Sequence, residues 1–290
     1  MKDVHNLIAR LEKEAVGSDS LEKRVENYLI DFATGGNYAR MFTNTEGVAE
    51  VITLQTAHMR SMFESFPEIV LIDATHDTNK SNYKLFSFMI HDAFDKGYHV
   101  QHSLIGNEKK ETLRTAIRQF KEACPTFDYI ACIMVDKDFT EIAVLEEEFP
   151  SARVLLCHFH VVQCLHREVA NSKYNFDAWT KNEMRQLCRL LISAPSERIY
   201  NEVIEATKVV IRNNAKQDLW FKMLDNNWTP CKTRWSSIHR GNIPHMGNQT
   251  NNRGMKCVTF RAAGGLTRMA PFFGSNYDFW KLYKMENVLM

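Results

Sequence analysis

The sequence has no long hydrophobic run and no recognisable secretory signal. Its longest unbroken apolar stretch, Tyr129 to Val135, has seven residues, whereas a helix needs roughly 20 to cross a bilayer. The first residues lack the basic and apolar regions of a signal peptide, so we expect the seven cysteines to be thiols or metal ligands in a reducing compartment. These absences argue against a membrane protein and against a disulfide scaffold.

Common catalytic signatures are missing as well. The sequence contains no GxxxxGK[ST] loop, no GxGxxG turn, no GxSxG elbow and no HExxH helix, which removes the usual support for a nucleotide-binding fold, a serine hydrolase or a zinc protease. What is present is the balance of a globular chain. Its 290 residues are 44% hydrophobic and 24% charged, enough for one large domain or two ordinary ones.

Charge is unevenly distributed along the chain, although the net charge is only +1. Residues 1–65 carry seven Lys or Arg against ten Asp or Glu, whereas the segment from Asn226 to Ser275, called the basic segment below, carries seven and no acid. Such a segment is typical of a surface that contacts an anion, but also of a merely solvated face. The candidate DNA contacts in it are Lys232, Arg234, Arg240, Arg253 and Lys256.

Hydrophobic patterning divides the chain into four segments. It predicts a helical lead-in over 1–65, an α/β core over 66–165, a helical insertion over 166–235, and a degenerate glycine-rich segment over 236–290. The core reads β-β-β-α-β-α-β. Three strands able to pair antiparallel, followed by helical crossovers that join parallel strands, predict an α/β fold with a mixed sheet covered by helices. The ribonuclease H fold has this order of elements.

Two aspartates, Asp73 and Asp136, each end an apolar run that predicts a strand. Sites tend to form at the carboxyl ends of strands with parallel neighbours, where two such carboxylates could share Mg²⁺ or Mn²⁺ and activate water against a phosphodiester. The alternative is that both simply end their strands. Asp138 is better explained as a helix N-cap with Glu141 as its reciprocal partner, which leaves Asp136 as the metal candidate.

Cys157 and His160 form a C-x-x-H unit, and Cys164 follows His160 by one helical turn. These three side chains could converge on zinc. Structural zinc sites usually need four nitrogen or sulfur ligands, however, and no second pair of this spacing occurs. The pattern therefore favours a buried structural contact between Cys157 and His160 over a zinc ion.

Three segments together resemble a known family. The stretches Phe66–Asn79, Val135–Glu141 and Val154–Val161 are similar to the transposase-derived core of SWIM-type zinc-finger proteins, which are related to Mutator-like transposases. The resemblance implies a ribonuclease H-like core in which two aspartates and a glutamate hold two divalent metals for DNA cleavage and transfer.

Residue by residue, the resemblance makes Asp73 the first acid and Asp136 the second. It makes Cys157 and His160 the family's C-x-x-H signature. The third acid is expected shortly after a Thr-Asn-Asn-Arg segment, and at that position this sequence has Met255. The paired zinc ligands that give SWIM-type proteins their name are also absent from the sequence.

The replacement at Met255 bears on activity. A thioether is soft and neutral and cannot replace a carboxylate on Mg²⁺, and the basic segment contains no other acid. We therefore expect an inactive, transposase-derived module that binds DNA or protein in the nucleus. The alternatives are an active two-metal transposase or nuclease whose third acid is Glu168 or Glu183, or a degenerate product without a selected function.

Overall fold

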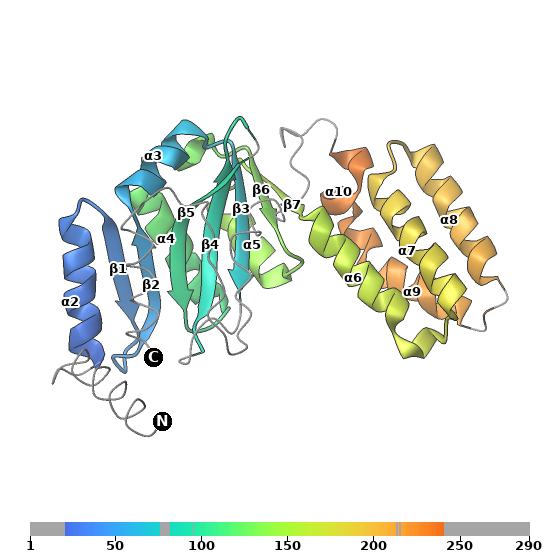
Figure 1. Ribbon diagram of the computed structural model, residues 1–290, viewed down its shortest axis with the longest axis horizontal. Helices are drawn as coiled ribbons and strands as arrows, with labels where there is room; N and C mark the ends of the chain where they lie inside the picture. Colours follow the sequence, from blue (N-terminus) through green and yellow to red (C-terminus); the bar gives the residue numbers. More distant parts are fainter. Residues whose placement is uncertain (1–20, 76–81, 95, 213, 215, 241–290) are drawn as a thin grey trace, which may run out of the picture.

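The computed structural model describes residues 21–75, 82–94, 96–212, 214 and 216–240. Figure 1 shows two parts, a sheet flanked by helices and a group of helices beyond one edge of that sheet. No helix in the described ranges is long and apolar enough to cross a membrane.

A seven-stranded mixed sheet forms the centre of the first part, in the order β1-β2-β5-β4-β3-β6-β7. The five strands from β1 to β3 pair antiparallel, whereas β3 with β6 and β6 with β7 pair parallel. This sheet confirms the predicted α/β class. The strands are β1 (Tyr38–Thr43), β2 (Ala49–Gln55), β3 (Ile69–Thr75), β4 (Lys84–His91), β5 (Gly97–Ile105), β6 (Cys132–Val135) and β7 (Arg153–Leu156).

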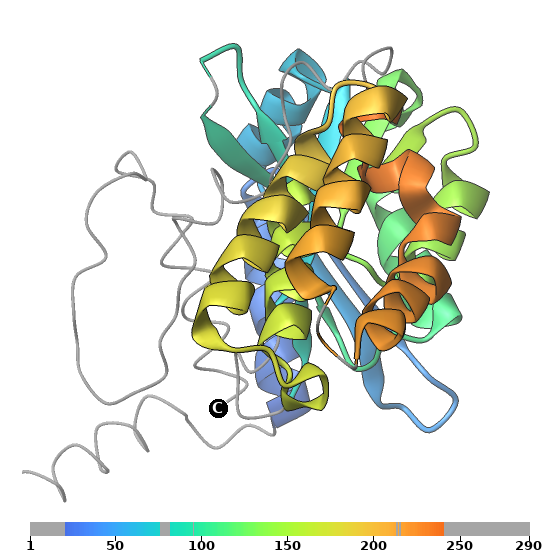
Figure 2. The same cartoon turned by 90° about the vertical axis from the view of Figure 1, so that its right-hand side faces the viewer.

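Helices flank the sheet and form the second part. In Figure 2, which looks at the molecule from the side of β7, α6 to α9 lie in front of the sheet. These helices share one continuous hydrophobic core with the sheet. The bounds are α2 (Leu21–Thr34), α3 (Ala57–Ser65), α4 (Lys110–Ala123), α5 (Phe139–Glu148), α6 (His158–Ala170), α7 (Ala178–Ser193), α8 (Glu197–Ile211), α9 (Gln217–Asn227) and α10 (Lys232–Trp235).

The prediction of a helical lead-in over residues 1–65 is wrong between residues 38 and 55, which form β1 and β2. The Val51-Ile52-Thr53 run of β2 is β-branched and favours a strand. Both faces of this run are buried, so it lacks the alternation of polar and apolar residues that marks a half-buried strand. The sheet therefore begins well before residue 66.

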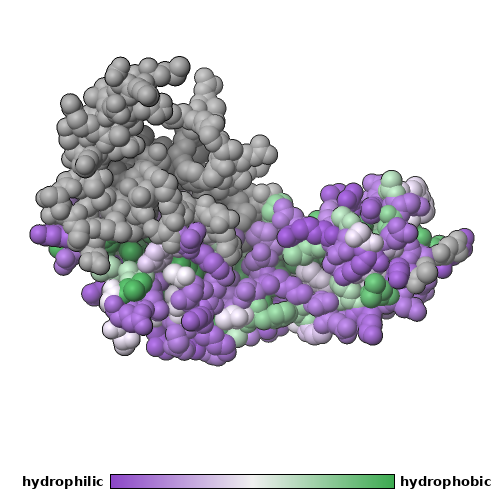
Figure 3. Space-filling view, turned by 90° about the horizontal axis from the view of Figure 1, so that it is seen from below, coloured by the Kyte–Doolittle hydropathy of each residue, from purple (hydrophilic) through white to green (hydrophobic). Residues whose placement is uncertain are grey.

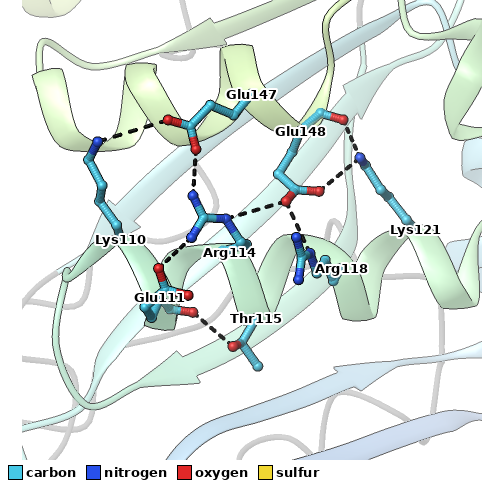
Figure 4. A network of polar contacts seen from close by, with 8 residues as sticks. All are labelled: Lys110, Glu111, Arg114, Thr115, Arg118, Lys121, Glu147 and Glu148. Atoms are coloured by element: carbon cyan, nitrogen blue, oxygen red, sulfur yellow. Dashed lines mark hydrogen bonds and ion pairs between the residues drawn. The ribbon is translucent and has the colours of Figure 1, made fainter.

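A network of ion pairs connects α4 to α5 on one face of the sheet (Figure 4). Arg114 lies 2.5 Å from a carboxylate oxygen of Glu147. The side chain of Glu148 is only 10% exposed and lies 3.0 Å from Arg118 and 3.1 Å from Lys121. These contacts hold the C-terminal end of α5 against α4.

Two arginines cover the β7 edge of the sheet. Arg234 donates to the carbonyl oxygen of Val154 at 3.4 Å, and Arg240 donates to the carbonyl oxygen of Leu156. Residues two apart in a strand point their carbonyl groups to the same side, so both oxygens are unpaired acceptors of an edge strand. The end of the helical part thus completes the hydrogen bonding of the sheet.

Candidate functional site

The two predicted acids lie at the ends of neighbouring parallel strands. Asp73 lies two residues before the end of β3, and Asp136 directly follows β6. The pairing of these strands places Leu71 opposite Met134, and the same register places Asp73 level with Asp136. The structure therefore brings the acids, called the acid pair below, to the carboxyl-end edge where α/β folds form their sites.

His160 adjoins the acid pair. The helix α6 begins directly after Cys157, so its first turn places the His160 Nδ1 atom 3.6 Å from the Asp136 Oδ1 atom. Burial opposes the charged form of His160, but a hydrogen bond with Cys157 and the carboxylates of Asp136 and Asp73 outweigh it and raise the pKa of His160. The Cys–His contact expected from the C-x-x-H unit is present, and it holds an imidazole beside the acids.

The described residues do not fit a bound two-metal centre. Nowhere in the described ranges do three or more His, Cys, Asp or Glu side chains group so that they could hold a metal ion. Cys164 lies 3.5 Å from a guanidinium nitrogen of Arg167 instead of joining Cys157 and His160 in such a group.

The acids considered in the helical insertion pair elsewhere. Glu168 accepts a hydrogen bond from the Tyr174 hydroxyl at 2.5 Å and forms an ion pair with Lys173. Glu183 lies 3.4 Å from the side-chain amide of its neighbour Asn182. Neither contact involves the acid pair, so the described structure gives no support to a third ligand from this part of the chain.

Glu141 is a buried acid, and its burial could not be recognised from the sequence. Asp138 caps α5 as predicted, accepting from the Thr140 and Glu141 amides at 2.8 and 2.9 Å. The Glu141 side chain, however, is buried, and its Oε1 atom has no hydrogen-bond partner. Burial, together with the charges of Asp138, Asp73 and Asp136, raises the pKa of Glu141 well above its usual value.

The predicted DNA contacts do not form a free basic surface where they are described. Lys232 lies 2.9 Å from a carboxylate oxygen of Glu197, and Arg234 lies 2.7 Å from one of Glu146. Arg240 is only 2% exposed. Acids distant in sequence pair with Lys232 and Arg234, and Arg240 is buried against backbone carbonyl groups. The expected contacts Arg253 and Lys256, like Met255, lie outside the described residues.

A mixed sheet with an aspartate near the end of the interior strand β3 and another level with it directly after β6 is the arrangement of a ribonuclease H-like fold. Residues 31–155 match the family model described as "Zinc finger SWIM domain-containing protein 1/3, RNaseH-like domain". The match confirms the resemblance seen in the sequence: residues 31–155, less than half of the chain, are similar to the ribonuclease H-like domain of this SWIM zinc-finger family. The domain includes β1 and β2.

A solved structure is also similar to part of this chain. It is the catalytic core domain of HTLV-2 integrase, in complex with magnesium and in a dimeric form. The sequences are 13% identical, the match covers 44% of this chain and 87% of the integrase chain, and the TM-score is 0.21.

Proposed function

We propose that this chain is a transposase-derived, ribonuclease H-like protein that has lost DNA strand cleavage and transfer and acts as a DNA-binding module in the nucleus. The observation that carries the proposal is an acid pair in register at the ends of β3 and β6 without a third metal ligand among the described residues. Because a fold alone does not determine a function, the binding part of the proposal rests on separate evidence, the basic segment.

The chemistry of the missing ligand supports the loss of cleavage. Divalent metals in such a site activate water and stabilise the leaving oxygen of a phosphodiester. Asp73 and Asp136 are the only two family acids that this sequence matches, and Met255 stands where the third is expected. Burial and the neighbouring carboxylates raise the pKa of Glu141 well above its usual value, and this shift opposes the charged form that a carboxylate ligand needs.

A cleavage assay tests the inactive state directly. The 290-residue chain is incubated with supercoiled plasmid and a labelled duplex in Mg²⁺ or Mn²⁺, beside Asp73→Ala and the control Asp31→Ala, which removes an exposed aspartate of α2. We expect no cleavage above that of Asp73→Ala. Metal-dependent cleavage that Asp73→Ala abolishes and Asp31→Ala retains would overturn the proposal in favour of an active two-metal nuclease.

The DNA-binding part of the proposal rests on the basic segment, which carries no acid. Lysine and arginine contacts to phosphate are lost steeply as salt rises. We expect Arg253→Ala/Lys256→Ala to weaken DNA binding and to reduce the salt slope by about 2, because each phosphate contact contributes about 0.9 to that slope. The control is Arg198→Ala/Lys208→Ala, which removes equal charge from α8.

Fluorescence anisotropy with duplex DNA between 50 and 200 mM salt, concentrations at which such contacts differ by orders of magnitude in strength, measures both quantities. An affinity that is independent of salt, or an equal loss in both double variants, contradicts phosphate contacts by the basic segment. A tagged chain is expected in the nuclear fraction of cells, and its exclusion from that fraction contradicts the proposed location.

A further inference from the structure

The helix α7 carries a row of exposed hydrogen-bond donors, called the α7 face below. Its members are Asn182, Arg185, Gln186 and Arg189, and all four side chains are exposed. They occupy positions i, i+3, i+4 and i+7, a spacing that places them on one face of a helix. At a rise of 1.5 Å per residue, the row extends about 10 Å along the helix.

The two arginines of the α7 face have no carboxylate partner. Within the described part of the chain, no ion pair involves Arg185 or Arg189. The acid of α7, Glu183, comes two residues before Arg185 and six before Arg189, and neither spacing makes side chains neighbours on a helix surface. The acid of α6, Glu168, pairs with Lys173. The positive charge of the α7 face is therefore not neutralised by α6 or α7.

His166 of α6 lies beside the same two arginines. Its Nε2 atom donates to the carbonyl oxygen of Arg185 at 3.2 Å, which connects α6 to α7 at this point. Burial lowers the pKa of His166, the hydrogen bond to Arg185 raises it, and the charges of Arg189 and Arg185 lower it again. Both guanidinium groups are thus close enough to affect the ring, so their charge is concentrated where α6 and α7 meet.

The position of α7 favours contact with a phosphate backbone over contact with bases. The helix packs against α6 and against α8, and Figure 2 shows α7 and α8 side by side in front of the sheet. The major groove of DNA is about 12 Å wide and admits one helix, not a helix with a neighbour on each side. In Figure 3 the visible face of the helical part, on the right, is mostly hydrophilic.

The side chains of the α7 face match the chemistry of phosphate. A guanidinium group binds phosphate through two parallel hydrogen bonds, and asparagine and glutamine side chains also donate to phosphate oxygens. Lys232 and Arg234 of the basic segment are instead paired with acids of the same chain. Among these cations, those of α7 are the ones available to an external anion.

We infer that the α7 face is a second DNA-binding surface, at which Arg185 and Arg189 contact the phosphate backbone of duplex DNA without reading its sequence. The inference rests on the proposed DNA-binding function, but it places contacts on the helical part of the chain and not only in the basic segment.

Fluorescence anisotropy of the 290-residue chain with labelled duplex DNA tests the surface. We expect Arg185→Ala/Arg189→Ala to weaken binding at least ~10-fold at about 100 mM salt and to reduce the salt slope by about 2, because two phosphate contacts are lost. The matched control is Arg198→Ala/Lys208→Ala on α8, which removes equal charge from side chains that acids of α8 already neutralise. The control should leave both quantities nearly unchanged.

A third double variant, Arg253→Ala/Lys256→Ala, separates this inference from the proposed function. A loss caused by the α7 variant supports the inference, whether or not the third variant also weakens binding. An α7 variant that binds like the α8 control overturns the inference, and a loss in the third variant then leaves the proposed function standing. A wild type that does not bind DNA overturns both. Tighter binding to a duplex RNA of equal length overturns the assignment to DNA.

Two further measurements test charge and location. Arg185→Lys/Arg189→Lys keeps the charge and should keep the wild-type salt slope, whereas a loss as large as that of the alanine variant, with an unchanged circular dichroism spectrum, overturns a contact made through charge. The photoreactive residue p-benzoylphenylalanine at Gln186 should cross-link to DNA on irradiation. The same residue at Asn201, an exposed position of α8, should not. Cross-linking from Asn201 but not from Gln186 contradicts the assigned surface.

Discussion

The two edges of the sheet end in opposite ways. At β7, the carbonyl oxygens of Val154 and Leu156 accept hydrogen bonds from Arg234 and Arg240. At β1, the helix α2 packs beside the strand, and the side chains of Met41 and its neighbours are exposed. The same physical problem, an edge strand, is met by arginine hydrogen bonds to the backbone at one end of the sheet and by a packed helix at the other.

The comparison shows that the ribonuclease H-like core is not complete by itself. The family match ends at residue 155, yet the groups that cover β7 come from Arg234 and Arg240, far along the chain. The helical part also supplies Trp235, whose carbonyl oxygen lies 2.7 Å from the His158 ring at the start of α6. The helical part is therefore more than an inserted segment, because it supplies contacts to β7 and to the start of α6.

The β7 and β1 sides of the sheet also differ in the ionisable side chains that they bury. The β7 side contains Arg240, Glu141 and His160, all buried, whereas the β1 side has buried apolar residues and an exposed ion pair. Burying ionisable groups costs free energy, and clusters of groups with shifted pKa values are typical of functional sites. The β7 side has the electrostatic character of a site, although the residues that the structure describes supply no full set of metal ligands.

Arg240→Ala should have the largest effect on stability, a loss of about 3 kcal/mol in the free energy of unfolding. The variant leaves the Leu156 and Arg234 carbonyl oxygens without this donor and removes one of the largest fully buried side chains. Urea denaturation measures the loss, with Arg198→Ala on the surface of α8 as the control. A loss no greater than that of the control would show that β7 does not need this cover.

Glu141→Gln should stabilise the protein by about 1–2 kcal/mol at pH 8 and leave it unchanged near pH 4. The folded state raises the pKa of Glu141 above the unfolded value of about 4.3. Below the unfolded value both states are protonated, so nothing is gained. Above it, the unfolded state ionises first and the folded state loses stability as pH rises, a cost that glutamine does not carry.

Thermal unfolding at the two pH values measures this difference, with Glu205→Gln, an exposed residue of α8, as the control. A gain of equal size at both pH values would mean that packing, and not ionisation, sets the effect. A loss of stability at pH 8 would mean that the Glu141 carboxyl makes an interaction that requires its charge.

The acid pair and the Cys157–His160 contact could be predicted because their signals are local. An aspartate that ends an apolar run marks a strand end, and once neighbouring strands are parallel the ends meet at one edge. The C-x-x-H spacing likewise needs only a strand end followed by a helical turn. The same local reasoning identified Asp138 as the cap of α5, which the structure confirms.

The features that could not be predicted depend on distant partners. Nothing near Arg234 in the sequence indicates that it meets Glu146, and nothing near Lys232 indicates Glu197. A count of charges therefore suggested a free basic surface where the folded chain has ion pairs. Glu141 was assigned to the cap by its spacing, whereas its burial depends on how α5 packs against the sheet.

Met41→Lys should have the smallest effect on the stability of the protein, within about 0.5 kcal/mol. The Met41 side chain is 42% exposed, and lysine is a residue that natural edge strands use, so the folded chain loses little. Urea denaturation measures this, beside Arg240→Ala at the opposite edge. A loss approaching that of Arg240→Ala would show that the Met41 side chain is packed in the folded chain, and the difference between the two edges would then disappear.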